Sequence, residues 1–208
     1  MEGGFLKNLS SLQKDALKEI GNVGAGNAAT AFAQFLDCKI EMTVPSVEIL
    51  SISEVPEITG GMEKVVIGVL LSVLGEAPGS ILLILSEEST VNLLEIVLEQ
   101  NIDLTGLDEV QTSAVKEIGN ILAGSYLNAL NQMTGFNLIQ SVPAFCYDMA
   151  GAILSSSMIP ISEESDYALL IETKFIKGDS EIEGYFFLIP NHGSLEKILG
   201  SLGLETNE

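Results

Sequence analysis

The pentapeptide KEIGN occurs twice in the chain, and each copy carries a carboxylate and an amide three positions apart. Residues three apart lie on one face of a helix, so Glu19 and Asn22 are expected side by side, as are Glu117 and Asn120. A carboxylate and an amide without a paired nucleophile favour the positioning of water over covalent catalysis. We therefore expect the asparagine to orient a water molecule and the glutamate to anchor a partner through a cation.

On an arbitrary helix, an exposed Glu-x-x-Asn pair is usually only a solvated surface feature. Here the pair recurs at a single offset of 98 residues (117 minus 19), with the same glycine and a matching downstream proline. The offset also matches the following pairs: Gln13 with Gln111, Ala25-Gly26 with Ala123-Gly124, Gln34 with Gln132, and Pro45 with Pro143. We interpret the chain as one domain, residues 1–208, built from two repeats at about 8–103 and 106–205.

Each repeat is predicted to begin with a long helix that has a capping signal. Ser10 precedes Gln13 by three positions, and Asp108 precedes Gln111 by the same spacing, which is typical of a capping box or its close variant. Apolar residues then recur at steps of three and four, which predicts one core-facing stripe per helix. The predicted stripes are Leu12, Ala16, Ile20, Val23 and Asn27 or Ala28 in the first repeat, and Val110, Ala114, Ile118, Ile121 and Leu122 in the second.

The remaining pattern predicts β-strands separated by glycine turns, and an amphipathic helix that closes each repeat. The predicted strands are 38–52, 64–74 and 80–85, then 137–142, 167–176 and 184–190; the closing helices are near 87–99 and 193–202. The segment 144–158 is predicted to be an extra helix without a counterpart. The expected fold is α/β (α+β): two pseudo-twofold-related repeats, each helix, three strands and helix, sharing a mainly antiparallel sheet with both motif helices on one face.

Glycines inside the predicted motif helices need an explanation, because each costs about 1 kcal/mol relative to alanine. Gly26 and Gly124, each preceded by alanine, fit close packing between the two helices. Gly21 and Gly119 lie beside the asparagines, and there we favour a bare patch that lets a partner approach the amide.

Composition excludes several classes of function. A net charge of −20 opposes binding to nucleic acid and to anionic membranes, and all nine basic residues are lysines, so the chain offers no arginine to a phosphate. The densest apolar run, residues 65–75, is too short to span a bilayer. No secretion signal is visible, so a cytoplasmic protein is expected. Cys38 and Cys146 are expected to be buried free thiols, and His192 a surface residue, so no metal site is expected.

The two motif copies resemble the signature of the CheC family of chemotaxis phosphatases, which act on the phosphorylated response regulator CheY. The signature is Asp or Ser, three residues, Glu, two residues, Asn, twenty-two residues and Pro. The chain carries it twice, as Asp15, Glu19, Asn22 and Pro45, and as Ser113, Glu117, Asn120 and Pro143. Two complete copies resemble CheC itself more than its single-site relative CheX.

The resemblance implies a mechanism for the matching positions. Glu19 or Glu117 would pair with a lysine in the regulator's active site, while Asn22 or Asn120 holds a water in line with the aspartyl phosphate. The regulator would bring its own Mg²⁺, so no cofactor of the chain itself is expected. Asp15, Ser113 and the two prolines would support the pairs. Asp15 can equally be a solvated helix residue.

The resemblance also implies a second partner, the receptor deamidase CheD, with Asp148 at the polar position of its docking segment. The alternative is that Asp148 caps a helix. Two other functions stay open at this point: a non-catalytic adaptor that binds phosphorylated CheY or CheD, and an interaction module of the flagellar switch. A monomer is expected, because the duplication supplies internally what a homodimer would provide.

Overall fold

The computed structural model of the chain describes residues 9–36, 41–44, 46–103, 106–155, 167–177 and 180–204. In the first half, the elements are α1 (Ser11–Leu36), β1 (Glu41–Thr43), β2 (Val47–Ser51), a 3-10 turn (Ile52–Glu54), α2 (Val55–Ile58), β3 (Val65–Leu74), β4 (Gly79–Ser86) and α3 (Glu87–Leu98). In the second half, they are α4 (Glu109–Thr134), β5 (Ile139–Gln140), β6 (Ala144–Met149), a helical segment at 150–155, β7 (Tyr167–Lys177), β8 (Ser180–Pro190) and α6 (Ser194–Ser201).

Both long helices begin at the predicted capping residues. The Ser10 hydroxyl accepts from the Gln13 backbone N–H at 3.2 Å, and the Gln13 side chain accepts from the Ser10 N–H at 2.8 Å. Asp108 and Gln111 form the same reciprocal pair at 2.8 and 3.0 Å. At the other end, α4 stops at Gly135, whose φ of 75° is readily adopted by glycine. Local sequence therefore fixes where the motif helices start.

One eight-stranded sheet joins the two repeats, in the order β1-β7-β8-β4-β3-β5, with β2 also on β7 and β6 also on β3. Every described strand pair is antiparallel. The first repeat's β1 and β2 pair with β7 of the second repeat, and the second repeat's β5 and β6 pair with β3 of the first. The central contact is between β4 and β8. The repeats thus exchange strands, and the predicted joint sheet is confirmed.

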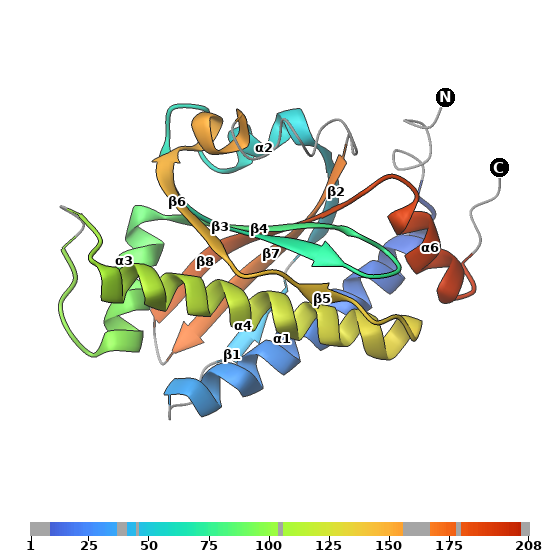
Figure 1. The fold of residues 1–208 in the computed structure, drawn as a ribbon, viewed down its shortest axis with the longest axis horizontal. Helices are drawn as coiled ribbons and strands as arrows, with labels where there is room; N and C mark the ends of the chain where they lie inside the picture. Colours follow the sequence, from blue (N-terminus) through green and yellow to red (C-terminus); the bar gives the residue numbers. More distant parts are fainter. Residues whose placement is uncertain are drawn as a thin grey trace.

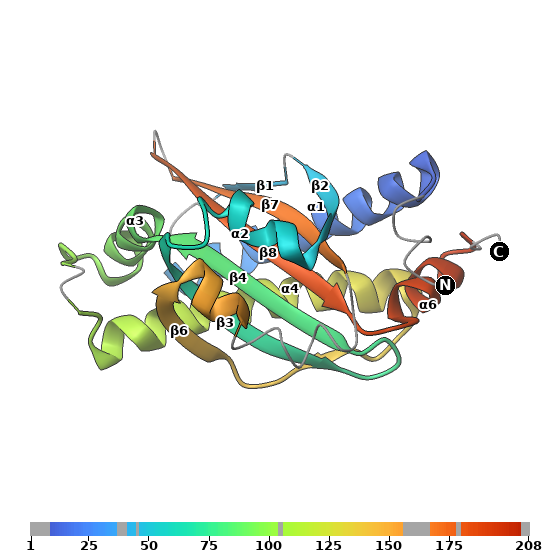
Figure 2. The ribbon, with the colours of Figure 1, turned by 90° about the horizontal axis from the view of Figure 1, so that it is seen from above.

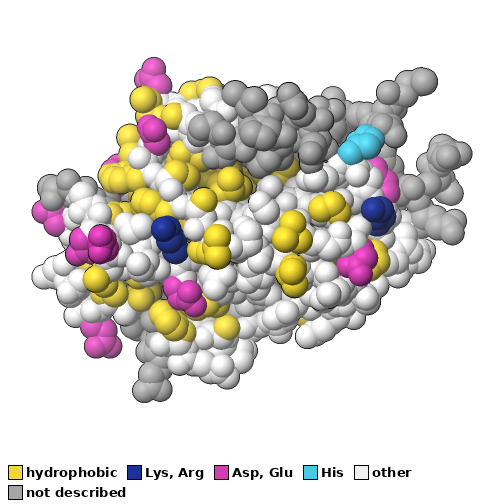
Figure 3. All heavy atoms as spheres, viewed as in Figure 1, with side chains coloured by type: hydrophobic (Ala, Val, Ile, Leu, Met, Phe, Trp, Pro, Cys, Tyr) yellow, Lys and Arg dark blue, Asp and Glu magenta, His cyan; other side chains and the backbone are white. Residues whose placement is uncertain are grey.

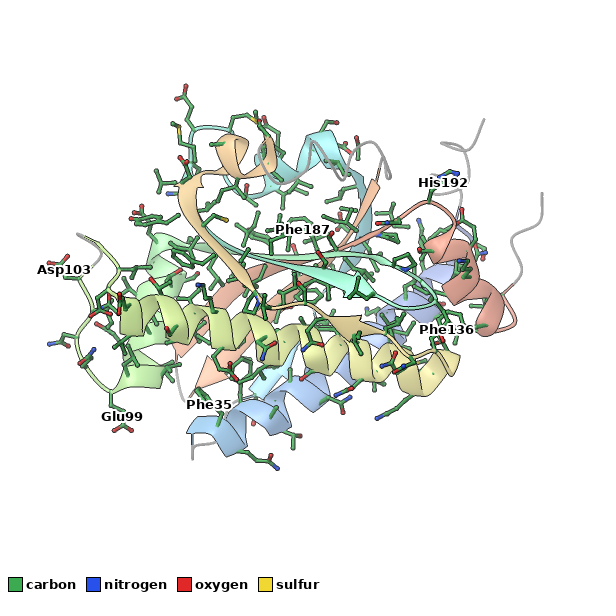
Figure 4. The ribbon with its side chains drawn as sticks, in the orientation of Figure 1. Phe35, Glu99, Asp103, Phe136, Phe187 and His192 are labelled. Carbon is green, nitrogen blue, oxygen red and sulfur yellow. The ribbon has the colours of Figure 1, made fainter. Side chains whose placement is uncertain are left out.

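Apolar cores cover both faces of this sheet. The larger core lies under α1 and α4, which cross one face side by side in Figures 1 and 2, together with α3 and α6. The smaller core lies on the opposite face under α2 and residues 150–155, and it includes Phe187, labelled in Figure 4. Strands β4 and β8 contribute to both cores. Placement of both motif helices on one face is therefore confirmed.

The prediction of an extra helix at 144–158 is wrong over its first part. Residues 144–149 form β6, and helix is described only from residue 150 to 155. The segment also has a counterpart, because β6 pairs with β3 as β2 pairs with β7. Similarly, the predicted strand 38–52 contains two separate strands, so in the described part of the chain each repeat has four strands rather than three. Pairing with the other repeat, which no local pattern reveals, stabilises these short strands.

The predicted apolar stripes are wrong at their first positions. Leu12 and Val110 are 62% and 61% exposed, whereas Leu17 and Val115 are 2% and 0% exposed. The inward position in the first turn of α1 is taken by Gln13, whose side chain closes the cap. Among the described residues, no helix is long and apolar enough to cross a membrane.

Candidate functional site

The motif side chains lie on the outward edges of α1 and α4. Ile20 and Ile118 are 4% and 0% exposed and hold the helices against the core. Glu19, Asn22 and Glu117 are exposed, while Asn120 is half-buried. Each carboxylate and amide therefore share the outward side of one helix, as the spacing predicted.

The supporting positions of the signature are less uniform. Asp15 and Ser113 are exposed, one helical turn before the glutamates. Pro143 is half-buried in the irregular segment between β5 and β6. Pro45 lies outside the described residues.

The motif glycines do not clear a path for a partner. Gly21 and Gly119 are buried and face the sheet. A Cβ on Gly21 would lie 3.5 Å from Val44, and a Cβ on Gly119 would lie only 2.6 Å from Val69. The bare-patch interpretation is therefore wrong: both glycines face the sheet, and Gly119 lets α4 lie close to β3.

The interpretation of Gly26 and Gly124 as the helix crossing is also wrong. A Cβ on Gly26 would meet no atom within 4 Å, and one on Gly124 would approach the side chain of Gln140 at 3.0 Å. The close contact between α1 and α4 is instead at Gly24, where a Cβ would lie 2.4 Å from the ring of Tyr126. An aromatic ring fills the space that this glycine leaves, so one crossing contact is glycine against tyrosine rather than glycine against glycine.

The second motif copy has a neighbour that the sequence analysis did not identify. The Gln140 amide nitrogen lies 3.3 Å from Asn120 Oδ1 and 3.4 Å from the Asn120 backbone oxygen. The residue at the same offset in the first repeat is Met42. No hydrogen bond links the Asn22 side chain to any residue that the structure describes. The sequence signal that could have revealed this neighbour is the difference between Gln140 and Met42, which occupy matching positions of the two repeats.

The remaining singled-out residues lie away from the motif pairs. Cys146 is half-buried on β6, and burial raises the pKa of its thiol to about 11, although its hydrogen bond to Gly68 lowers the pKa. Cys38 lies outside the described residues. His192 is exposed in the turn before α6 (Figure 4). Asp148 is exposed and accepts a hydrogen bond from the Met149 N–H at 2.7 Å. In the described part of the chain, no group of three or more acidic, histidine or cysteine side chains is arranged to hold a metal ion.

Comparisons with known proteins agree with this geometry. Residues 12–49 and 110–147, which contain the two motif copies, match the model of the CheC-like family. Over 196 residues the chain is 35% identical to the CheY-P phosphatase CheC of Bacillus subtilis strain 168, covering 92% of this chain and 94% of that protein.

Two solved structures share the fold. One is FliY of Thermotoga maritima, with a TM-score of 0.75 and 21% identity, which covers 94% of this chain and 98% of the chain in that structure. The other is a CheX–CheY–BeF₃–Mg²⁺ complex from Borrelia burgdorferi, whose matching chain has a TM-score of 0.51 and 20% identity, with 81% of this chain and 96% of that chain covered.

Proposed function

The chain belongs to the CheC-like family, and from this premise we propose that it is a phosphatase that hydrolyses the aspartyl phosphate of the response regulator CheY. The observation that carries the proposal is the duplicated Glu-x-x-Asn pair on the outward edges of two packed helices. Identity of 35% to a CheY-P phosphatase along nearly its whole length supports it independently.

Each motif copy acts by positioning. Glu19 or Glu117 pairs with a lysine in the regulator's active site, and Asn22 or Asn120 orients the water that attacks phosphorus. The water's oxygen forms the new bond to phosphorus as the bond to the aspartyl oxygen breaks, which releases phosphate and a free carboxylate. An acyl phosphate is already labile, so orientation of the water supplies much of the acceleration required.

The regulator supplies the Mg²⁺ in this proposal. A CheX–CheY complex that contains BeF₃ and Mg²⁺ shares this fold and supports that view. The absence of arginine from the chain fits as well, because the charge that neutralises the phosphoryl group must then come from the partner. Asp15, Ser113, Pro45 and Pro143 are proposed to support the pairs from the adjacent turn and from the strand connection.

Exposed apolar side chains near the motifs support a protein substrate. Leu12 and Val110 are 62% and 61% exposed, and each precedes its motif glutamate by two helical turns on the same face. Val142, next to Pro143, is 87% exposed. Apolar side chains also lie among scattered charges on the face that carries α4 (Figure 3). Contiguous exposed apolar patches mark docking surfaces, and we propose that these side chains belong to one.

We also propose that Asp148 belongs to a separate docking surface for CheD, and that the protein acts in the cytoplasm as a monomer. Asp148 lies on β6, a different element from the motif helices. Replacing it with lysine should weaken CheD binding in a titration and leave CheY-P hydrolysis unchanged; an unchanged CheD affinity would contradict this assignment.

The activity is tested with phosphorylated CheY in large excess over this protein. A phosphatase should consume many equivalents, and the Glu19→Ala/Asn22→Ala/Glu117→Ala/Asn120→Ala variant should return decay to the spontaneous rate while staying folded. A non-catalytic adaptor would leave the acyl phosphate unchanged or protect it. That outcome would overturn the proposed function.

A further inference from the structure

Gln140 contacts the second motif in a way that fixes the orientation of both amides. Its terminal nitrogen lies near two oxygens of Asn120, at 3.3 Å from Oδ1 and 3.4 Å from the backbone carbonyl. The backbone carbonyl can only accept, so the NH₂ group of Gln140 must face Asn120, and the Asn120 carboxamide must then turn its oxygen toward that group. The Asn120 carboxamide oxygen is thereby held, and its NH₂ group remains available.

The backbone that carries Gln140 is tied to the fold on both sides. Gln140 lies opposite Val73 in the β3–β5 ladder. The next residue, Ser141, donates its N–H to the Ser72 carbonyl at 2.8 Å and accepts from the Ser72 N–H through its hydroxyl at 2.9 Å. These bonds fix the position from which the glutamine side chain extends.

The residue just before this strand is hydrogen-bonded to α4. The Asn131 side chain accepts from the Leu138 N–H at 2.8 Å and donates to the Leu138 carbonyl at 2.9 Å. Strand β5 is therefore bound at one end to the helix that carries Asn120 and at the other to the sheet.

Gly124 provides the space in which the Gln140 side chain lies. A Cβ on Gly124 would be 3.0 Å from the Gln140 amide nitrogen, which is closer than such atoms normally approach. Gly124 lies one helical turn after Asn120, so the amide of Gln140 spans from that glycine to the motif asparagine. The glycine and the glutamine act as a pair.

The first repeat has neither feature. Met42 occupies the position of Gln140, opposite Phe175 in the β1–β7 ladder, and its thioether has no N–H to donate. Gly26 occupies the position of Gly124, and a Cβ there would meet nothing within 4 Å. Asn22 is exposed, whereas Asn120 is half-buried.

We infer that Gln140 is a positioning residue for the hydrolysis proposed above, and that it makes the second motif the better preorganised of the two. Holding one end of the Asn120 amide limits its rotation and places the other end for the attacking water. The inference rests on the proposed function, because it assigns a role within that reaction. It adds a ranking of the sites, with the second site the faster.

The test uses the Glu19→Ala/Asn22→Ala protein, in which only the second site remains. Adding Gln140→Met, which installs the first repeat's residue, should lower kcat for CheY-P by roughly 3- to 10-fold and leave KM unchanged. The matched control is Gln132→Met, on an exposed position of the same helix as Asn120, which should change neither constant. A loss confined to kcat separates positioning of water from binding of the regulator.

Gly124→Ala supplies a second, independent variant. It should displace the Gln140 amide and lower kcat in the same background, but it should have little further effect when combined with Gln140→Met, because the displaced group is then absent. This variant decides the question if Gln140→Met fails to fold.

The outcomes separate the two proposals. A Glu19→Ala/Asn22→Ala protein without turnover would overturn the proposed function at this site, and the role of Gln140 with it. If the Glu19→Ala/Asn22→Ala protein turns over and adding Gln140→Met changes its kcat by less than about twofold, only the positioning role is overturned. Loss of a positioning group should lower kcat by more than that. A raised KM with unchanged kcat would likewise overturn it and make Gln140 a binding residue.

Discussion

The two motif copies carry the same outward groups on differently built supports. Glu19 and Asn22 lie exposed on α1, whereas Asn120 is half-buried and hydrogen-bonded to Gln140. Beneath the motifs, a Cβ on Gly21 would make ordinary contacts at 3.5 Å, while a Cβ on Gly119 would lie 2.6 Å from Val69. The outward-facing groups are the same in both repeats, but the packing around them is different.

The strand exchange is alike in both repeats, so the surroundings of the two motifs differ through their side chains rather than through their topology. Gly119 of α4, in the second repeat, lies over β3 of the first repeat. Gly21 of α1, in the first repeat, lies over Val47 of the same repeat and Ile171 of the second repeat. Each motif helix packs on strands from both halves of the chain, because α4 also contacts β5 and β6 of its own repeat. Two copies of one motif do not by themselves give two equal sites.

The largest expected effect is on catalysis. Asn120→Ala in the Glu19→Ala/Asn22→Ala background should reduce kcat for CheY-P on the order of 10²-fold, because the group that orients the water is lost. The initial rate of phosphate loss from CheY-P measures it, with circular dichroism as the check on folding. Retention of most of the rate would mean that the second amide does not position the water.

The motif glycines should respond unequally to the same substitution. Gly119→Ala forces a Cβ against Val69 and should lower the free energy of unfolding by about 1–3 kcal/mol. Gly21→Ala makes only ordinary contacts and should be neutral or stabilise the fold by up to about 1 kcal/mol, through its helix propensity. Urea unfolding of both variants measures the difference, and equal costs would contradict the asymmetry described above.

The bond between Asn131 and β5 should matter for both stability and rate. Asn131→Ala, which introduces the alanine found at the matching position 33, leaves two backbone groups of Leu138 without their side-chain partner. The free energy of unfolding should fall by about 1–2 kcal/mol, and second-site kcat should fall less than with Gln140→Met. A variant with unchanged stability would show that the bond does not hold β5.

The smallest effect is a pH dependence from the helix crossing. Burial raises the pKa of Tyr126 to about 12, while its hydrogen bond to Thr173 lowers the pKa. The folded state therefore disfavours the phenolate. The resulting contribution of Tyr126 to the free energy of unfolding is complete below pH 10 and is lost as the pH rises from 10 towards 12. By pH 11 the loss should be about 1 kcal/mol. Tyr126→Phe should remove that part of the alkaline loss in urea unfolding at pH 9 and 11, and an identical pH dependence would contradict it.

Sequence patterns predicted the features that depend on neighbouring residues. The capping boxes, the β3–β4 and β7–β8 hairpins and the closing helices follow from local spacing and turns. Strand β6 was missed because its six residues become a strand through pairing with β3, which lies far away in the chain. The same reason explains why the exchange of strands between repeats was not foreseen.

The motif spacing also located the Glu and Asn pairs, but not their surroundings. Gly21 and Gly119 were assigned to the partner side because spacing alone does not show which side of a helix a sheet covers. Gln140 was missed because its contact with Asn120 spans 20 residues and depends on the position of β5. The proposed site residues themselves remain predictions until the variants are measured.

The most direct measurement compares the two sites within one protein. Turnover of saturating CheY-P is measured for the Glu19→Ala/Asn22→Ala protein and for the Glu117→Ala/Asn120→Ala protein, each shown to be folded. The account predicts that both retain turnover and that the former, with only the second site, has the higher kcat. Equal rates, or a faster first site, would contradict the claim that the support around Asn120 makes the two sites unequal.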